Sequence, residues 1–409
     1  MEFNTLLLRG KEVNRYAFGG TQPCISQSST YAYQSAEDLE KVFNNRLPGF
    51  AYTRVSNPTV DAFERRVNEL EGGLAALACS SGMAAVSTTL LNLLCSGDEI
   101  ISSNALFGGT LEFFRELEKF GITTHLVDRM DVDSVAPLIN DKTRVIFTEI
   151  VFNTSLDVVD VKALAELAHS HALPLVVDAT TVTPFILRPF TLGADILVHS
   201  SSKYITGSGN AISGIIVDSG RFNWDFERFK ALADYRRFQR YAFIARLRSS
   251  LWRNLGGCLS PFNAYLNVVG LETLGLRMER ICHNAHALAN ALEGVDGLKV
   301  TYPGLASSPY YELVQRQFNG LGGGIINLRT GSRERAFALM NKLKYASLAT
   351  NIGDLRTLVI YPLTTIYQHI DPKSCARVGV YDDTLRISVG IEDERDLIAD
   401  FSQAAAFEN

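Results

Sequence analysis

From about Leu74 onward the sequence repeats one pattern: a short apolar run, a turn of small residues, and then an amphipathic segment. This alternation is typical of strands and helices that follow one another along a chain. Several of the apolar runs are nearly continuous in branched residues, as in parallel strands covered by helices on both faces. The runs are LAALAC, DEIISS, TTHLVD, RVIFTEI, LPLVVDA, ADILVHS and GIIVDS. We therefore predict an α/β fold with a mainly parallel sheet.

The same pattern divides the chain into three parts. Residues 1–55 lack it, so we expect an N-terminal arm that packs on a neighbouring subunit. Residues 56–257 form the expected large domain, whose first helix begins at Asn57-Pro58, an N-cap followed by proline at the first helical position. Residues 258–409 show mixed strand and helix patterns, which predict a smaller α+β C-terminal domain.

The composition of the chain argues against several classes of binding partner. The formal net charge of −5 gives no general attraction for nucleic acid or acidic membranes. The arginines and aromatic residues of 221–253 are explained by a solvated helix face or a subunit contact. The six cysteines lack metal-finger spacing, and no apolar stretch approaches a membrane span. We predict a cytoplasmic protein with reduced thiols and no metal, nucleic acid or membrane partner.

Polar residues follow several predicted strands at their carboxyl ends, where α/β sheets bind ligands. LAALACSSGM opens into a helix at Gly82 and Met83, whose free N–H groups suit a phosphate. LPLVVDA ends at Asp178, RVIFTEI at Glu149, and ADILVHSSSK at Lys203. Singly, these features are explained by a tight turn, a structural ion pair or a surface lysine. Together they provide the parts that hold pyridoxal 5′-phosphate, with its phosphate on the helix start, its ring nitrogen on Asp178 and its aldehyde as an imine on Lys203.

Several segments, in a preserved order, resemble the Cys/Met-metabolism family of pyridoxal-phosphate enzymes, also called the trans-sulfuration or cystathionine γ-synthase family. They are YTRVSNPT (52–59), SSGMAA (80–85), FGGT (107–110), VVDAT (176–180), HSSSKYITG (199–207), CLSPFNAYLNVVGLETLGLRM (258–278), SLATNIGDLRTLVIYP (347–362) and LRISVGIED (385–393). The resemblance runs over nearly the whole chain. It implies an aspartate-aminotransferase-like fold of type I and a homotetramer built from two catalytic dimers, with each active site shared between two subunits.

The resemblance also assigns site residues by motif. Lys203 would be the imine lysine, and Phe107 would lie against the cofactor ring. The expected cofactor-binding residues are Ser81, Gly82, Met83, Phe107, Asn153, Asp178, Thr180, Ser200, Ser202 and Lys203, with Tyr52 and Arg54 reaching the cofactor of the neighbouring subunit. Asn153 would contact the ring hydroxyl and the substrate, and Ser347 and Arg386 would place the substrate carboxylate, a task that suits the planar fork of arginine.

Some positions depart from the family pattern. Phe107 stands where the family usually has the tyrosine of YGGT, so it can stack on the ring but has no hydroxyl for proton exchange. The segment EIVFNTS around Asn153 is altered, and Ala179 replaces the asparagine that usually follows the ring aspartate. We expect the cofactor still to bind, but with a chemical reactivity that differs from the family's usual one.

The segments 347–362 and 220–257 are most similar to the O-acetylhomoserine sulfhydrylase branch. This implies that an activated homoserine loses its ester group and that a sulfur nucleophile adds at the γ-carbon, giving homocysteine or a related amino acid. Lys203, once freed, would remove the α-proton and then the β-proton.

Other functions stay open at this point. One is γ- or β-elimination on methionine, cystathionine or a related amino acid, although Gly109 stands where methionine γ-lyases usually carry a cysteine. Another, suggested by Phe107, is a cofactor-binding protein with little turnover. A dehydrogenase is disfavoured because GSGNAISG lacks the third glycine of the dinucleotide fingerprint.

Overall fold

The structure is a computed structural model that describes residues 1–10, 16–44, 46–368 and 372–406. Its larger sheet has seven strands in the order β1-β7-β6-β5-β4-β2-β3. β7 runs antiparallel to both neighbours, and the pairs from β6 to β3 are parallel. The strands are β1 (Ala75–Cys79), β2 (Glu99–Ser103), β3 (Thr123–Val127), β4 (Thr143–Glu149), β5 (Leu175–Asp178), β6 (Ile196–His199) and β7 (Gly214–Asp218). The prediction of a mainly parallel α/β sheet is confirmed.

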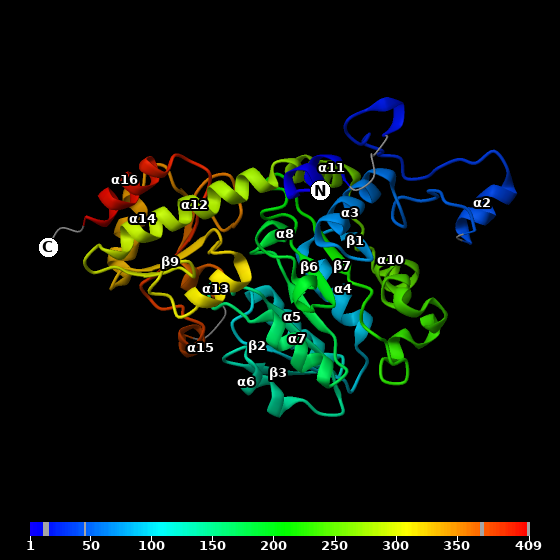
Figure 1. Ribbon diagram of the computed structural model, residues 1–409, viewed down its shortest axis with the longest axis horizontal. Helices are drawn as coiled ribbons and strands as arrows, with labels where there is room; N and C mark the ends of the chain where they lie inside the picture. Colours follow the sequence, from blue (N-terminus) through cyan, green and yellow to red (C-terminus); the bar gives the residue numbers. More distant parts are fainter. Residues whose placement is uncertain (11–15, 45, 369–371, 407–409) are drawn as a thin grey trace.

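Helices cover this sheet on both faces (Figure 1). α3 begins where the sequence predicted, because the Asn57 side chain accepts hydrogen bonds from the N–H groups of Thr59 and Val60. It ends at Gly72, whose φ of 74° is the left-handed conformation that glycine adopts without strain. The helices around the sheet are α3 (Pro58–Glu71), α4 (Gly82–Leu93), α5 (Gly108–Lys119), α6 (Val132–Val135), α7 (Val161–Ser170), α8 (Thr183–Ile186), α9 (Ala242–Arg246) and α10 (Trp252–Leu255).

A second sheet of five strands lies beside the first, in the order β10-β11-β12-β9-β8 (Figure 1). Its strands are β8 (Lys299–Thr301), β9 (Ile325–Arg329), β10 (Ser347–Leu348), β11 (Leu358–Ile360) and β12 (Thr384–Ser388). The helices of this half are α13 (Tyr311–Phe318), α14 (Arg333–Lys342), α15 (Pro372–Arg377) and α16 (Glu394–Ala405). Mixed parallel and antiparallel pairing makes this an α+β arrangement, as predicted for the C-terminal part.

α11 (Pro261–Glu272) and α12 (Leu274–Glu293) connect the two halves. This helical segment is interrupted at Thr273, because α11 ends directly before that residue and α12 starts directly after it. Met278 and Ile281 of α12 pack into the core of the larger sheet, and Leu288 and Leu292 pack into the core of the smaller one. One helix therefore couples the two cores mechanically. The domain boundaries predicted at residues 55 and 257 stay predictions.

The N-terminal segment has two different parts. α1 (Phe3–Arg9) buries Leu6 and Leu7 in the larger core. α2 (Ala36–Phe43) projects away from the rest of the chain (Figure 1). Its Phe43 side chain is 66% exposed, which is costly for an aromatic ring in water. Within the residues that the structure describes, no helix is both long and apolar enough to span a membrane. The same residues contain no group of three or more His, Cys, Asp or Glu side chains that could hold a metal ion.

Candidate active site

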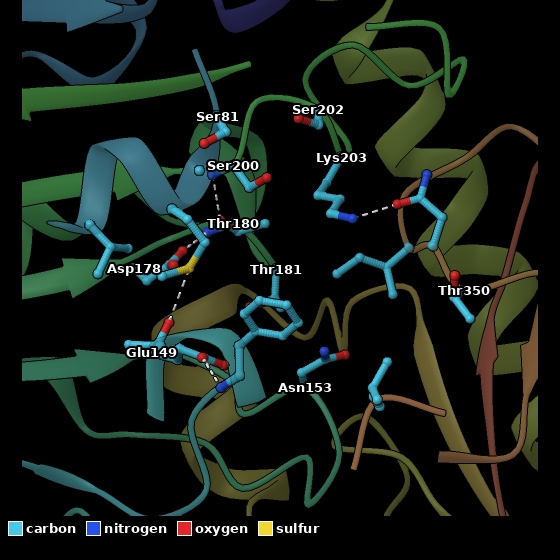
Figure 2. Close-up of a pocket in the computed structure, with 18 of the residues that line it drawn as sticks. Ser81, Glu149, Asn153, Asp178, Thr180, Thr181, Ser200, Ser202, Lys203 and Thr350 are labelled. Carbon is cyan, nitrogen blue, oxygen red and sulfur yellow. Dashed lines mark hydrogen bonds between the residues drawn. The ribbon is translucent and has the colours of Figure 1, made fainter. Parts of the chain in front are cut away.

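The carboxyl ends of β4, β5 and β6 meet the start of α4 at a cavity of about 700 Å³ (Figure 2). Parallel pairing brings Glu149 of β4 directly opposite Asp178 of β5. The chain then leaves β6 through Ser200, Ser202 and Lys203, which line the same cavity. The convergence predicted from the strand ends is therefore what the backbone topology produces.

The start of α4 leaves backbone donors facing the cavity. Ser81 caps the helix by accepting a hydrogen bond of 3.0 Å from the N–H of Ala84. The N–H groups of Gly82 and Met83 lie in the first turn, where no helical acceptor exists. Gly82 cannot carry a side chain, since a Cβ there would lie 2.5 Å from the Cβ of Ser200. This close approach creates a compact site with a partial positive charge.

Thr180 connects the ends of β5 and β6. Its N–H donates to Asp178 Oδ1 at 2.9 Å, and its hydroxyl oxygen accepts from the N–H of Ser200 at 2.8 Å. Burial raises the pKa of Asp178 above its usual range, although Thr180 partly stabilises the charged form. The structure gives Asp178 no ion pair with any described residue. A cationic partner inside the cavity would stabilise this carboxylate strongly.

Lys203 reaches into the cavity from the loop after β6 (Figure 2). Its Nζ donates to Asn351 Oδ1 at 2.5 Å. Burial is the main cause that lowers the pKa of Lys203 to about 8, and the positive charge of Arg386 is the second cause. A substantial fraction of the amine is therefore neutral near neutral pH, as a nucleophile or a base requires.

Arg386 is a buried cation on the other side of the cavity. Its Nη1 donates to Asn153 Oδ1 at 3.0 Å and its Nη2 to the carbonyl oxygen of Asn351 at 3.1 Å. Burial lowers its pKa to about 10. Nε of Arg386 is buried without a hydrogen-bond partner in the described structure. A carboxylate ligand would supply both the missing acceptor and the missing negative charge.

Phe107 lines the cavity at the start of α5 and is 41% exposed. Its N–H donates to Glu149 Oε1 at 2.6 Å, which ties the turn carrying the ring to the end of β4. Burial raises the pKa of Glu149, and the neighbouring Asp178 adds to the rise. The sequence pattern predicted that Glu149 lies at a strand end, but no role was predicted for it.

Some predicted residues lie elsewhere or are already engaged. Tyr52 and Arg54 do not line the cavity of their own chain, and Arg54 Nη1 donates instead to the carbonyl oxygen of Arg253 at 2.7 Å. Ser202 lines the cavity, but its hydroxyl donates to the carbonyl oxygen of Ser213 at 2.9 Å. These geometries leave the predicted roles of Tyr52, Arg54 and Ser202 as predictions.

Ser347 requires a correction. It lies exposed in the short strand β10, paired with Leu358, and does not line the cavity. The chain reaches the cavity only further along, at Thr350 and Asn351. Asn351 was not predicted from the sequence, because its contact with Lys203 joins two distant segments. The other lining residues without a prediction are Val86, Thr110, Thr181, Ile212, Thr350, Ile352, Thr364, Thr365, Ile366 and Gln368.

The chain is similar to known proteins over nearly its whole length. A family model described as Cys/Met metabolism PLP-dependent enzyme matches residues 4–406. A sulfhydrylase of Fusarium oxysporum f. sp. lycopersici is 38% identical over 396 residues, which cover 93% of this chain and 92% of that protein. An O-acetyl-L-homoserine sulfhydrylase of Leptospira meyeri is 36% identical over 402 residues, covering 93% and 91%.

A solved structure shows the same fold. The crystal structure of a putative O-acetylhomoserine (thiol)-lyase from Campylobacter jejuni subsp. jejuni matches with a TM-score of 0.94 and 32% sequence identity, over 100% of both chains. That protein carries N′-pyridoxyl-lysine-5′-monophosphate at its position 205.

Proposed function

Because the chain belongs to the Cys/Met metabolism family of PLP-dependent enzymes, we propose that it catalyses γ-replacement on an activated homoserine such as O-acetylhomoserine. A sulfur nucleophile replaces the acyl group, and the product is homocysteine or a related amino acid. The fold is the type I fold of pyridoxal-phosphate enzymes. One cavity is lined by Lys203, Asp178, the start of α4 and Arg386, which has no carboxylate partner among the described residues. This observation carries the proposal.

The residues around the cavity fit pyridoxal 5′-phosphate. The first-turn N–H groups of Gly82 and Met83 suit its phosphate, and the unpaired carboxylate of Asp178 suits a protonated ring nitrogen. The partly neutral amine of Lys203 suits its aldehyde. The bound cofactor supplies an electron sink for the charge that develops when a proton leaves the substrate's α-carbon.

Lys203 is the residue to which we assign the proton transfers. The described lining residues whose side chains titrate are Glu149, Asp178, Lys203 and Arg386. Asp178 and Glu149 lie together at the strand ends, and Arg386 stays charged because its pKa remains at about 10. Lys203, with a pKa of about 8, can both accept and return a proton near neutral pH. Asn351 holds its Nζ by a hydrogen bond and so orients the amine.

Arg386 and Asn153 are assigned to substrate orientation. The guanidinium has a free Nε and carries a buried charge, so it would pair with the α-carboxylate of an amino acid. Asn153 Oδ1 accepts from Arg386, which leaves the amide N–H₂ of Asn153 to donate into the cavity. Phe107 offers an apolar ring surface and no proton, so departure of the γ-substituent cannot depend on an acid at this position.

The direct test is a substrate assay on the purified protein loaded with pyridoxal 5′-phosphate. O-acetylhomoserine with sulfide should give homocysteine, and omitting sulfide should abolish it. Formation of ketoacid and ammonia alone, at the same rate with and without sulfide, would overturn γ-replacement in favour of elimination. Inactivity with O-acetylhomoserine, O-succinylhomoserine, cystathionine and methionine would overturn the enzymatic assignment itself.

We also propose a homotetramer in which each active site is shared between two subunits. Support comes from Tyr52 and Arg54, which lie away from the cavity of their own chain, and from the exposed side chains of Leu39 and Phe43 on the projecting α2. Mixing inactive Lys203→Ala and Arg54→Ala subunits should restore activity, because a mixed pair contains one intact site. No recovery after verified subunit exchange would refute the shared site. The cytoplasmic location expected from the sequence stays a prediction.

A further inference from the structure

Thr154 and Tyr367 form a buried hydrogen bond between segments 213 residues apart in sequence. Thr154 Oγ1 and the Tyr367 hydroxyl oxygen lie 2.6 Å apart. The two residues are 0% and 2% exposed, respectively, so water cannot replace either partner. Burial also raises the pKa of Tyr367, which keeps this a neutral hydrogen bond across the pH range of any ordinary assay. Such a bond is directional and fixes the separation of the two segments.

The Thr154 side of this bond has other supports. Asn327 Nδ2 donates to the carbonyl oxygen of Thr154, and Arg386 Nη1 donates to the side chain of the preceding Asn153. Asn327 and Arg386 are direct partners in the register of β9 and β12. The smaller sheet therefore holds residues 153 and 154 through the backbone and through Asn153, whether or not the Thr154 hydroxyl is present.

The Tyr367 side is the cavity wall formed by residues 364–368. Thr364, Thr365, Ile366 and Gln368 line the cavity, while Tyr367 is buried in the protein core. Among the residues that the structure describes, the other hydrogen bonds of this wall are short-range, such as that from the N–H of Tyr367 to the carbonyl oxygen of Pro362. They shape the turn without fixing it to the larger sheet.

The wall also abuts the turn that carries Phe107. A Cβ on Gly108 would lie 3.1 Å from the carbonyl oxygen of Ile366. A shift of the wall would therefore change the space beside Phe107, where the sequence departs from the family pattern. Removing the hydroxyl contact should move the wall while residues 153 and 154 stay in place.

We propose that Thr154 and Tyr367 are positioning residues, whose hydrogen bond fixes the wall 364–368 and thereby determines how tightly the cavity holds the side chain of its amino-acid substrate. The inference rests on the proposed function, because it requires an amino acid to occupy the cavity. It assigns neither residue a contact with substrate or cofactor.

The test compares Tyr367→Phe, Thr154→Val and the double variant with the wild-type holoenzyme. Tyr302→Phe is the matched control, because its buried hydroxyl donates to the carbonyl oxygen of Gly323 at 2.9 Å and does not line the cavity. The probe is norleucine, an unbranched amino acid without a leaving group, whose dissociation constant is read from the cofactor absorbance. Cofactor dissociation constants, melting temperatures and KM for O-acetylhomoserine are measured in parallel.

We expect each single variant to weaken norleucine binding about fivefold, the equivalent of one neutral buried hydrogen bond. The double variant should be no weaker than either single variant, because both remove the same bond. Cofactor affinity should stay unchanged, and Tyr302→Phe should alter stability alone.

Unchanged norleucine binding in both single variants, additive losses in the double variant, or an equal loss of cofactor affinity would each overturn the inference. Norleucine binding does not require turnover. A wild-type protein that binds norleucine but makes no homocysteine would therefore refute the proposed function and still leave the role of Thr154 and Tyr367 measurable.

Discussion

Capture of pyridoxal 5′-phosphate by the apo-protein should follow the ionisation of Lys203, because only a neutral amine attacks an aldehyde. Burial is the main cause that lowers the pKa of Lys203 from 10.5 to about 8, and Arg386 contributes next. At pH 7.5 an amine with a pKa of 8 is about 25% neutral, against about 0.1% for one with a pKa of 10.5. The cavity therefore raises the reactive fraction by a factor on the order of 200.

The assay is the initial rate of capture between pH 6 and pH 10.5, followed by the change in cofactor absorbance at constant ionic strength. The wild-type rate should rise tenfold per pH unit below about pH 8 and level off above it. Arg386→Gln removes the nearby positive charge, so its midpoint should move upward but stay below 10.5, because burial remains. Arg316→Gln, at an exposed arginine paired with Asp160, should leave the midpoint unchanged.

A wild-type midpoint near 10.5 would refute the reasoning, since it would show that the amine is solvated in the apo-protein. A downward shift in Arg386→Gln would refute the electrostatic part alone. Lys203→Ala provides the baseline, because binding that persists in this variant reports the phosphate and ring contacts without the amine.

The remaining predictions concern the residues around Lys203. Asp178→Asn should weaken cofactor binding about 100-fold or more, measured by equilibrium titration, because a buried ion pair loses one charge; an unchanged dissociation constant would contradict the pairing with the ring nitrogen. Phe107→Tyr should raise the ratio of ketoacid to homocysteine in the sulfide assay, since the hydroxyl adds a proton donor at the cavity; an unchanged ratio would show that this position does not control the outcome. Glu149→Gln should make the melting temperature of the apo-protein less sensitive to pH. The pKa of Glu149 is raised in the folded state, so its contribution to stability is present below its usual pKa and is lost as pH rises through the raised value; equal pH sensitivity of both proteins would contradict the buried state of this carboxyl.

Residues that follow strands were predictable because a local pattern determines their position. An apolar run ends, a polar residue follows, and parallel pairing brings successive run ends to one edge of the sheet. Gly82, Asp178 and Lys203 all line the cavity for this reason. Phe107 could be placed through the motif FGGT, whose first residue directly precedes α5.

Residues on the smaller sheet were harder to predict, because their place relative to the cavity depends on how the two halves of the chain pack against each other. The motif beginning at Ser347 was assigned from its first residue, yet β10 ends at Leu348 and the chain enters the cavity only at Thr350 and Asn351. The bond between Thr154 and Tyr367 likewise joins segments with no common local pattern. Hydrogen bonds across such distances leave no periodic signal in the sequence.

Arg386 lies between these cases, and strand geometry explains why a buried arginine faces the cavity. Leu385 and Ile387 are 0% exposed and pack into the core of the smaller sheet. Side chains alternate between the two faces of a strand, so Arg386 must face the opposite side, toward the larger sheet. β9 repeats the arrangement, with Ile326 and Leu328 in the core of the smaller sheet and the buried Asn327 on the face toward the larger half.

The register of β12 against β9 then determines which residues of the larger half Arg386 and Asn327 contact. Arg386 and Asn327 are direct partners, and both donate to consecutive residues of the larger half, Asn153 and Thr154. A one-residue slip of β12 against β9 would turn Arg386 into the apolar core, which the cost of burying an unpaired charge forbids. The apolar alternation of the smaller sheet thus fixes the direction of the arginine, and the arginine in turn fixes one side of the cavity in which Lys203 acts.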